Sequence, residues 1–130
     1  MLEAYAAGLL DGEGSVMLNK VSGSIWRMPE VSVSSTTIEL IDFMEQYFGG
    51  YVSKVSKKED HHKQAWHWRI NYDGAISCLK RCLPWMLEPK KIYRGTLIVT
   101  EYKLVTPRNG KYSEEMILKK KDFEERFFRG

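Results

Sequence analysis

Apolar and polar residues alternate along this chain with two periods, one typical of strands and the other typical of helices. Period two predicts two strand pairs, at residues 15–21 with 25–35 and at 51–57 with 65–72. Helical spacing predicts a short opening helix that ends at Asp11-Gly12, and further helices at 38–48, 75–83, 90–104 and 113–128. This order predicts an α+β fold in which helices cover one face of a four-stranded antiparallel sheet.

The opening helix carries small residues on one side and ends in an acidic turn flanked by glycines. The small side consists of Ala4, Ala7, Gly8 and Asp11. Because positions three and four apart share a helix face, a second helix can approach closely there. Glu13 follows between Gly12 and Gly14, with nothing bulky to shield it. A carboxylate at the end of a close-packed helix pair is well placed to hold a metal ion, so Glu13 is the predicted ligand.

The strand predicted at 65–72 shows the clearest alternation in the chain. Its large apolar residues are Trp66, Trp68, Ile70 and Tyr72. They are expected to face the helices, which turns His67, Arg69 and Asn71 outward. The other strands are expected to add Met17, Asn19, Glu30, Ser32, Ser34, Ser53 and Lys57 to this outer face.

The expected outer face is rich in groups that can read the edges of nucleobases. Arginine pairs with guanine and asparagine with adenine, and a β-ribbon can enter the major groove of DNA. Arg27, Lys58 and Lys63 are expected to contact phosphates, which position a protein without specifying sequence. The alternative is that these residues are solvated polar positions of a one-sided sheet, and the phase of the third strand is the least determined.

Length and composition indicate a single domain over residues 1–130, with 43% hydrophobic and 28% charged residues. No apolar run approaches the roughly 20 residues that cross a bilayer, so no membrane partner is expected. The net charge of +3 is weak support for nucleic acid, but basic residues cluster locally. Cys78 and Cys82 are expected to be reduced thiols, as in an intracellular protein.

Residues 6–14, with the sequence Ala-Ala-Gly-Leu-Leu-Asp-Gly-Glu-Gly, resemble the signature of the LAGLIDADG homing endonucleases. The matching positions are Ala7, Gly8, Leu9, Asp11 and Gly14, while the substituted ones are Ala6, Leu10, Gly12 and Glu13. That family has the element order αββαββα, so the resemblance extends over about the first 105 residues and leaves a C-terminal helix at 113–128. The chain holds one copy of the motif, which points to a homodimer.

The resemblance implies a sequence-specific endonuclease that uses Mg²⁺, or Mn²⁺ in its place, to cut both strands of duplex DNA at a long, near-palindromic site. It implies Glu13 and the carbonyl of Gly12 as metal ligands. It also implies a catalytic lysine after the Pro84-Trp85 segment, at Lys90 or, with a shift of one residue, at Lys91. Ser35 stands where the family often has a water-orienting glutamine.

Two other functions remain open on the sequence. A protein of the same fold could bind DNA or RNA without cutting, as an intron maturase or transcription regulator, and an exposed sheet could instead bind another protein. Asp60 with His61-His62 is interpreted as an exposed loop tip, because adjacent histidines are expected to point apart. Residues 85–87 are interpreted as core. The expected location is intracellular, in a mitochondrion, a chloroplast or a bacterial or phage-infected cytoplasm.

Overall fold

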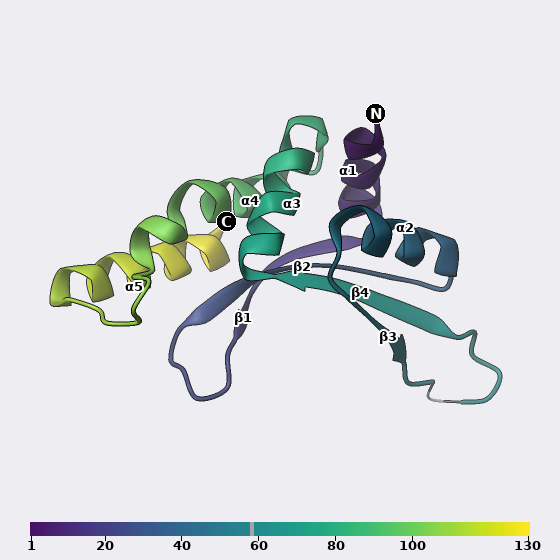
Figure 1. Ribbon diagram of the computed structural model, residues 1–130, viewed down its shortest axis with the longest axis horizontal. Helices are drawn as coiled ribbons and strands as arrows, with labels where there is room; N and C mark the ends of the chain where they lie inside the picture. The colour runs from purple at the N-terminus through teal and green to yellow at the C-terminus, as the bar shows by residue number, and fades with distance from the viewer. Residues whose placement is uncertain (58) are drawn as a thin grey trace.

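A layer of helices lies over one face of an arched antiparallel sheet (Figure 1), as the α+β prediction required. The computed structural model describes residues 1–57 and 59–130. The elements in chain order are α1 (Leu2–Glu13), β1 (Gly14–Lys20), β2 (Arg27–Ser35), α2 (Ile38–Phe48), β3 (Tyr51–Val55), β4 (Ala65–Asn71), α3 (Tyr72–Cys82), the 3-10 turn η1 (Leu83–Trp85), α4 (Pro89–Glu101), the 3-10 turn η2 (Lys103–Val105) and α5 (Glu114–Arg129).

The sheet has the strand order β1-β2-β4-β3, so the second strand of each hairpin lies at its centre. In the two central pairings, Val31 stands opposite both Val16 and Ile70, while Val33 stands opposite Trp68. These inward side chains are almost fully buried, and Trp68 donates its indole N–H to the carbonyl of Gly49 at 2.7 Å. Alternation along the strands therefore buries one face and leaves the other face polar.

Several predicted boundaries are wrong, and three of them have a local reason. Helix α1 continues one residue past Asp11-Gly12, to Glu13, and the chain turns into β1 at Gly14, where a Cβ would lie only 2.7 Å from the Cα of Leu10. Strand β3 ends at Val55, so Lys57 lies beyond the sheet. Tyr72 starts helix α3 with φ of 50° and is 45% exposed, so it does not continue the inward row of β4.

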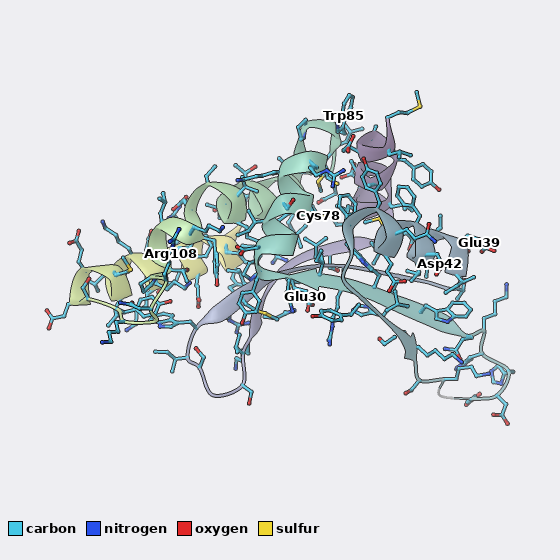
Figure 2. The ribbon with its side chains drawn as sticks, viewed as in Figure 1. Glu30, Glu39, Asp42, Cys78, Trp85 and Arg108 are labelled. Atoms are coloured by element: carbon cyan, nitrogen blue, oxygen red, sulfur yellow. The ribbon has the colours of Figure 1, made fainter. Side chains whose placement is uncertain are left out.

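Of residues 85–87, expected in the core, only the central one is buried. Met86 is 5% exposed, whereas Trp85 and Leu87 are 54% and 84% exposed. Figure 2 shows Trp85 at the end of the helical layer nearest the N-terminus, where η1 contacts α1. The two side chains thus add exposed apolar surface where η1 and the segment before α4 meet α1.

Cys78 and Cys82 are both buried free thiols on α3, consistent with the expected reduced state. Across the residues that the structure describes, no helix combines the length and apolar character that a membrane crossing needs.

Candidate functional site

Helix α1 divides into a buried face and an open face, and the split differs from the one predicted. Ala6, Ala7 and Leu10 are fully buried within the protein, so Ala7 is not available to a second subunit. The open face carries Leu2, Tyr5, Gly8 and Gly12, with Leu2 and Tyr5 about half exposed and free space around both glycines. Of the residues predicted for a dimer interface, Gly8 lies on the open face, Ala4 and Asp11 lie at its edge, and Ala7 lies in the core.

Asp11 holds the start of helix α4. Its carboxylate accepts hydrogen bonds from the backbone N–H groups of Leu87 at 2.9 Å and Glu88 at 3.1 Å. In return, Lys91 donates from Nζ to the carbonyl oxygens of Leu10 at 2.9 Å and Asp11 at 2.7 Å. A cation at the carbonyl end of α1 also suits the helix dipole. These bonds lock the last turn of α1 to the first turn of α4.

A second clamp holds the other end of α1. The carboxylate of Glu3 accepts hydrogen bonds from the hydroxyl of Tyr47 and from Arg81, which is 2.9 Å away. These two bonds lower the pKa of Glu3 to about 2, and the bond from Tyr47 has the larger effect. Helix α1 is therefore anchored at both ends, which fixes the position of its open face.

Glu13 and Gly12 lie at the end of this anchored helix, and both are exposed. Of the salt bridges formed by the described residues, none involves Glu13. Ser35 lies at the same end of the sheet, two residues past Val33, which pairs with Gly14. Its hydroxyl accepts a hydrogen bond from the backbone of Thr37 at 3.0 Å, so one of its acceptor positions is occupied locally.

A cavity of about 280 Å³ adjoins this end of α1, between β1 and α4. Its lining consists of Gly14, Ser15, Val16, Met17, Glu88, Lys90, Lys91 and Arg94. Both candidate lysines reach the cavity, but Lys91 is committed to the α1 carbonyls, whereas Lys90 is exposed. The lining includes three cationic side chains, those of Lys90, Lys91 and Arg94, and one carboxylate, that of Glu88. The carboxylate accepts a hydrogen bond from the backbone N–H of Lys91 at 2.6 Å. The cavity suits an anion such as a phosphate group.

Arg94 is the cavity residue that sequence reasoning missed. Its Nη1 lies 3.2 Å from the sulfur of Met17, and its guanidinium stacks 4.8 Å above the ring of Phe127. Its Nε is buried and finds no hydrogen-bond partner among the described residues. The signal was present, because Arg94 follows Lys90 by four residues and therefore shares its helix face.

The outer face of the sheet carries polar side chains in rows set by the strand register, and Figure 2 shows Glu30 on this side, away from the helices. One row is Met17, Glu30 and Asn71, the next is Ser15, Ser32, Arg69 and Tyr51, and the third is Ser34, His67 and Ser53. Asn19 belongs to the same face of β1 and donates to Glu30 at 2.6 Å. Period-two alternation also places Ser15 and Tyr51 here, which the prediction omitted.

Two predicted DNA contacts, Arg27 and Lys57, stand apart from this face. Arg27 turns inward, where its Nη1 donates to the carbonyl of Leu18 at 3.1 Å and its guanidinium lies 4.8 Å from the ring centre of Phe128. This fixes the start of β2 to α5, so the expectation that Arg27 reaches phosphate conflicts with its geometry. Lys57 lies in the loop after β3, and Lys58 lies outside the described residues.

The fold is that of nucleases known from solved structures with DNA. The homing endonuclease I-CvuI in complex with its target and calcium superposes with a TM-score of 0.73 at 16% identity, over 97% of this chain and 79% of that one. The LAGLIDADG homing endonuclease I-GzeII, also bound to its DNA target, gives 0.68 at 14% identity, over 96% of this chain and 43% of that one. The LAGLIDADG homing endonuclease I-SmaMI bound to cleaved DNA superposes with a TM-score of 0.57 at 20% identity, over 92% of this chain and 47% of that one.

No protein-family model matches the chain, and no curated sequence is similar enough to count as a match. The likeness is therefore one of fold: the chain has the architecture of the LAGLIDADG homing endonucleases, as residues 6–14 predicted. At identities of 14–20%, this likeness shows the fold alone.

Proposed function

We propose that this protein is a divalent-metal-dependent DNA endonuclease that acts as a homodimer and cuts both strands at a long, near-palindromic site. The observation that carries the proposal is the placement of Glu13. Its carboxylate is exposed at the end of α1, where an unfilled helix face, a cationic cavity and the polar face of the sheet come together. Carboxylate, cations and a base-reading surface are the components that phosphodiester hydrolysis at a chosen sequence requires.

The residues around Glu13 fit Mg²⁺. This ion prefers one or two carboxylates and keeps several waters or substrate oxygens, so it does not need a closed protein cage. Glu13 and the carbonyl of Gly12 are exposed oxygen donors, and Glu13 has no salt-bridge partner among the described residues. When bound, such an ion activates water and stabilises charge on the phosphate.

The side chains near Glu13 are suited to hold the phosphate. Lys90 is exposed at the cavity rim, and its ammonium forms no hydrogen bond or salt bridge with another described residue, so it can meet a phosphate oxygen. Arg94 supplies a second, fixed cation deeper in the same cavity. The Ser35 hydroxyl has a second lone pair and a proton, which leave it able to bond a water. Lys91 instead holds α1 against α4 and thereby keeps Glu13 in place.

A second copy of the chain is expected on the open face of α1. Gly8 and Gly12 leave room for another helix backbone to approach, and Leu2, Tyr5 and Leu87 surround them with exposed apolar surface. Pairing two α1 helices about a two-fold axis would set two Glu13 carboxylates side by side, one for each strand.

Replacing Glu13 by Gln tests the catalytic role, because the amide keeps the size of the side chain and removes its charge. A randomised duplex library incubated with Mg²⁺ and the wild-type protein should yield discrete cut ends. Glu13→Gln should lower cleavage at least about 100-fold, in line with the loss of a central electrostatic group, while DNA binding in Ca²⁺ persists. Glu39→Gln, on the exposed face of α2, is the matched control. Undiminished cutting by Glu13→Gln would exclude the metal role.

Filling the open face of α1 tests the dimer. Gly8→Phe adds a ring where the fold has free space, so the monomer should stay folded while the second helix is blocked. Sedimentation should show a dimer for the wild-type protein and a monomer for Gly8→Phe, which should also lose cleavage. Leu118→Phe, at a 69% exposed position of α5, is the control for added bulk. A wild-type monomer that cuts both strands would refute the symmetric arrangement.

A further inference from the structure

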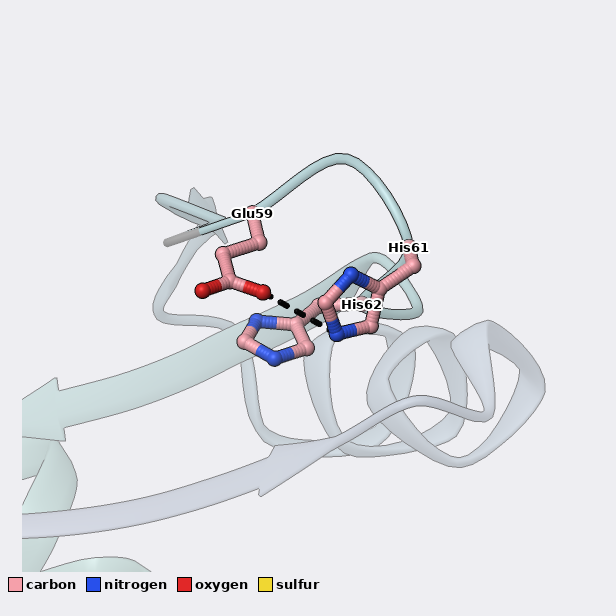
Figure 3. A group of neighbouring side chains, drawn as sticks. All are labelled: Glu59, His61 and His62. Atoms are coloured by element: carbon pink, nitrogen blue, oxygen red, sulfur yellow. Dashed lines mark ion pairs between the residues drawn. The ribbon is translucent and has the colours of Figure 1, made fainter.

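The loop between β3 and β4 brings two histidines and a glutamate together at its tip (Figure 3). One nitrogen of His61, one nitrogen of His62 and one carboxylate oxygen of Glu59 all lie within 4.8 Å of one another, and all three side chains are exposed. The expectation that adjacent histidines point apart is therefore wrong here. This cluster is far along the chain from Glu13 and plays no part in the proposed cleavage.

A backbone turn produces the convergence. The backbone N–H of His62 donates to the carbonyl of Glu59 at 3.1 Å, which closes a four-residue turn. Nε2 of His61 then lies 3.1 Å from the carboxylate of Glu59, and the two imidazole rings meet edge to face with centroids 4.6 Å apart. The ion pair in Figure 3 shows that the carboxylate and the first ring already face the same space.

We propose that Glu59, His61 and His62 form a binding site for a Zn²⁺-like transition ion. Two imidazoles with one carboxylate are a donor set typical of zinc, and bonds of about 2.0–2.1 Å in a tetrahedron separate neighbouring donors by about 3.3 Å. The observed spacing needs a contraction of at most about 1.5 Å, which rotation of three exposed side chains provides. The fourth position is left for water or for an oxygen of a bound anion.

The ion would change the electrostatics of the loop. It would add positive charge between Lys57 and Lys63, near the strand ends that carry Ser53 and His67 of the polar face. If the protein binds DNA as proposed above, on which this step rests, the charge would strengthen attraction to the phosphate backbone. Mg²⁺ would not substitute, because it favours oxygen ligands over imidazole. The loop site and the Glu13 site are thus expected to take different ions.

The first test uses the full chain without DNA and does not depend on the proposed function. Titration with Zn²⁺ at pH 7.5 by calorimetry should show one ion per chain, weakened at least about tenfold, or about 1.4 kcal/mol, in His61→Ala and in His62→Ala. His67→Ala, which removes the only other histidine, should bind as the wild type does. The absorption spectrum with Co²⁺ should lack a thiolate charge-transfer band, which excludes Cys78 and Cys82.

Equal zinc affinity in wild type and His61→Ala, or no uptake by the wild type, would overturn the site. A second experiment measures DNA affinity with and without Zn²⁺. Zn²⁺ should raise the affinity of the wild type, and it should not raise that of His61→Ala or His62→Ala. Zinc uptake without any DNA binding would refute the proposed function alone, and Mg²⁺-dependent cutting without zinc uptake would refute the inference alone.

Discussion

Lys120 on helix α5 is a fully buried cation, so its replacement by Met offers a quantitative test of the electrostatics of the fold. Its ammonium donates a hydrogen bond to Thr106 and lies 4.3 Å from the ring centre of Tyr102. Among the described residues it forms no salt bridge. Burial lowers the pKa of Lys120 from 10.5 to about 8, and the charge of Glu124 opposes this only in part.

The size of the effect follows from linkage. Lowering the pKa from 10.5 to about 8 corresponds to about 3 kcal/mol of preference for the unfolded state, at 1.36 kcal/mol for each pKa unit. Because the folded protein holds this proton less tightly, the penalty is complete below pH 8. It fades as the pH rises from about 8 to 10.5, where the amine is neutral in both states. The free energy of unfolding therefore increases with pH, as far as Lys120 determines it.

Met occupies a volume similar to that of Lys and carries no charge. At pH 7, Lys120→Met should raise the free energy of unfolding by about 1–3 kcal/mol, after about 1 kcal/mol is subtracted for the hydrogen bond to Thr106. At pH 9.5 this advantage should shrink by about 2 kcal/mol. Urea denaturation at both pH values measures the difference, in which the other titrating groups cancel. Lys119→Met, at the exposed neighbour, should change stability by less than about 0.5 kcal/mol.

A less stable Lys120→Met protein at pH 7, with a difference that does not vary with pH, would refute the reasoning. It would mean that the cation–π contact with Tyr102 and the bond to Thr106 outweigh the loss of hydration. The buried ammonium would then hold α5 in place, contrary to the direction of its pKa shift.

Two further predictions concern the junction of α1 and α4. Lys90→Ala should reduce cleavage at least about tenfold with little change in unfolding free energy. Lys91→Met should instead lower that free energy by about 1–3 kcal/mol, because the carbonyls of Leu10 and Asp11 lose the Lys91 ammonium and that of Leu10 keeps only the backbone N–H of Gly14. Cleavage assays and urea titrations on the same samples decide between the two lysines, and a purely catalytic effect of Lys91→Met would reverse the assignment. Asp11→Ala should cost about 1–2 kcal/mol by freeing two amides at the start of α4, measured by thermal unfolding, and unchanged stability would show that water replaces the carboxylate.

The polar face of the sheet was predictable because strand periodicity is local. Side chains on a strand alternate every residue, so the large apolar residues of β4 determine where His67, Arg69 and Asn71 point. The element order and the motif at residues 6–14 were likewise readable, since capping glycines and helical spacing act over a few residues. These features predicted both the α+β fold and its similarity to a nuclease architecture.

The side of α1 that stays open was decided by tertiary packing. Alanine and glycine both fit a close helix contact, and only the sheet and α3 determine that Ala7 is buried while Gly8 is left free. The roles of Lys90 and Lys91 were separated in the same way, because Lys91 meets its partners 80 and 81 residues earlier in the chain. Local patterns carry no information about contacts at such separations. A periodicity specifies a face, but which neighbour covers that face depends on how all the elements pack together.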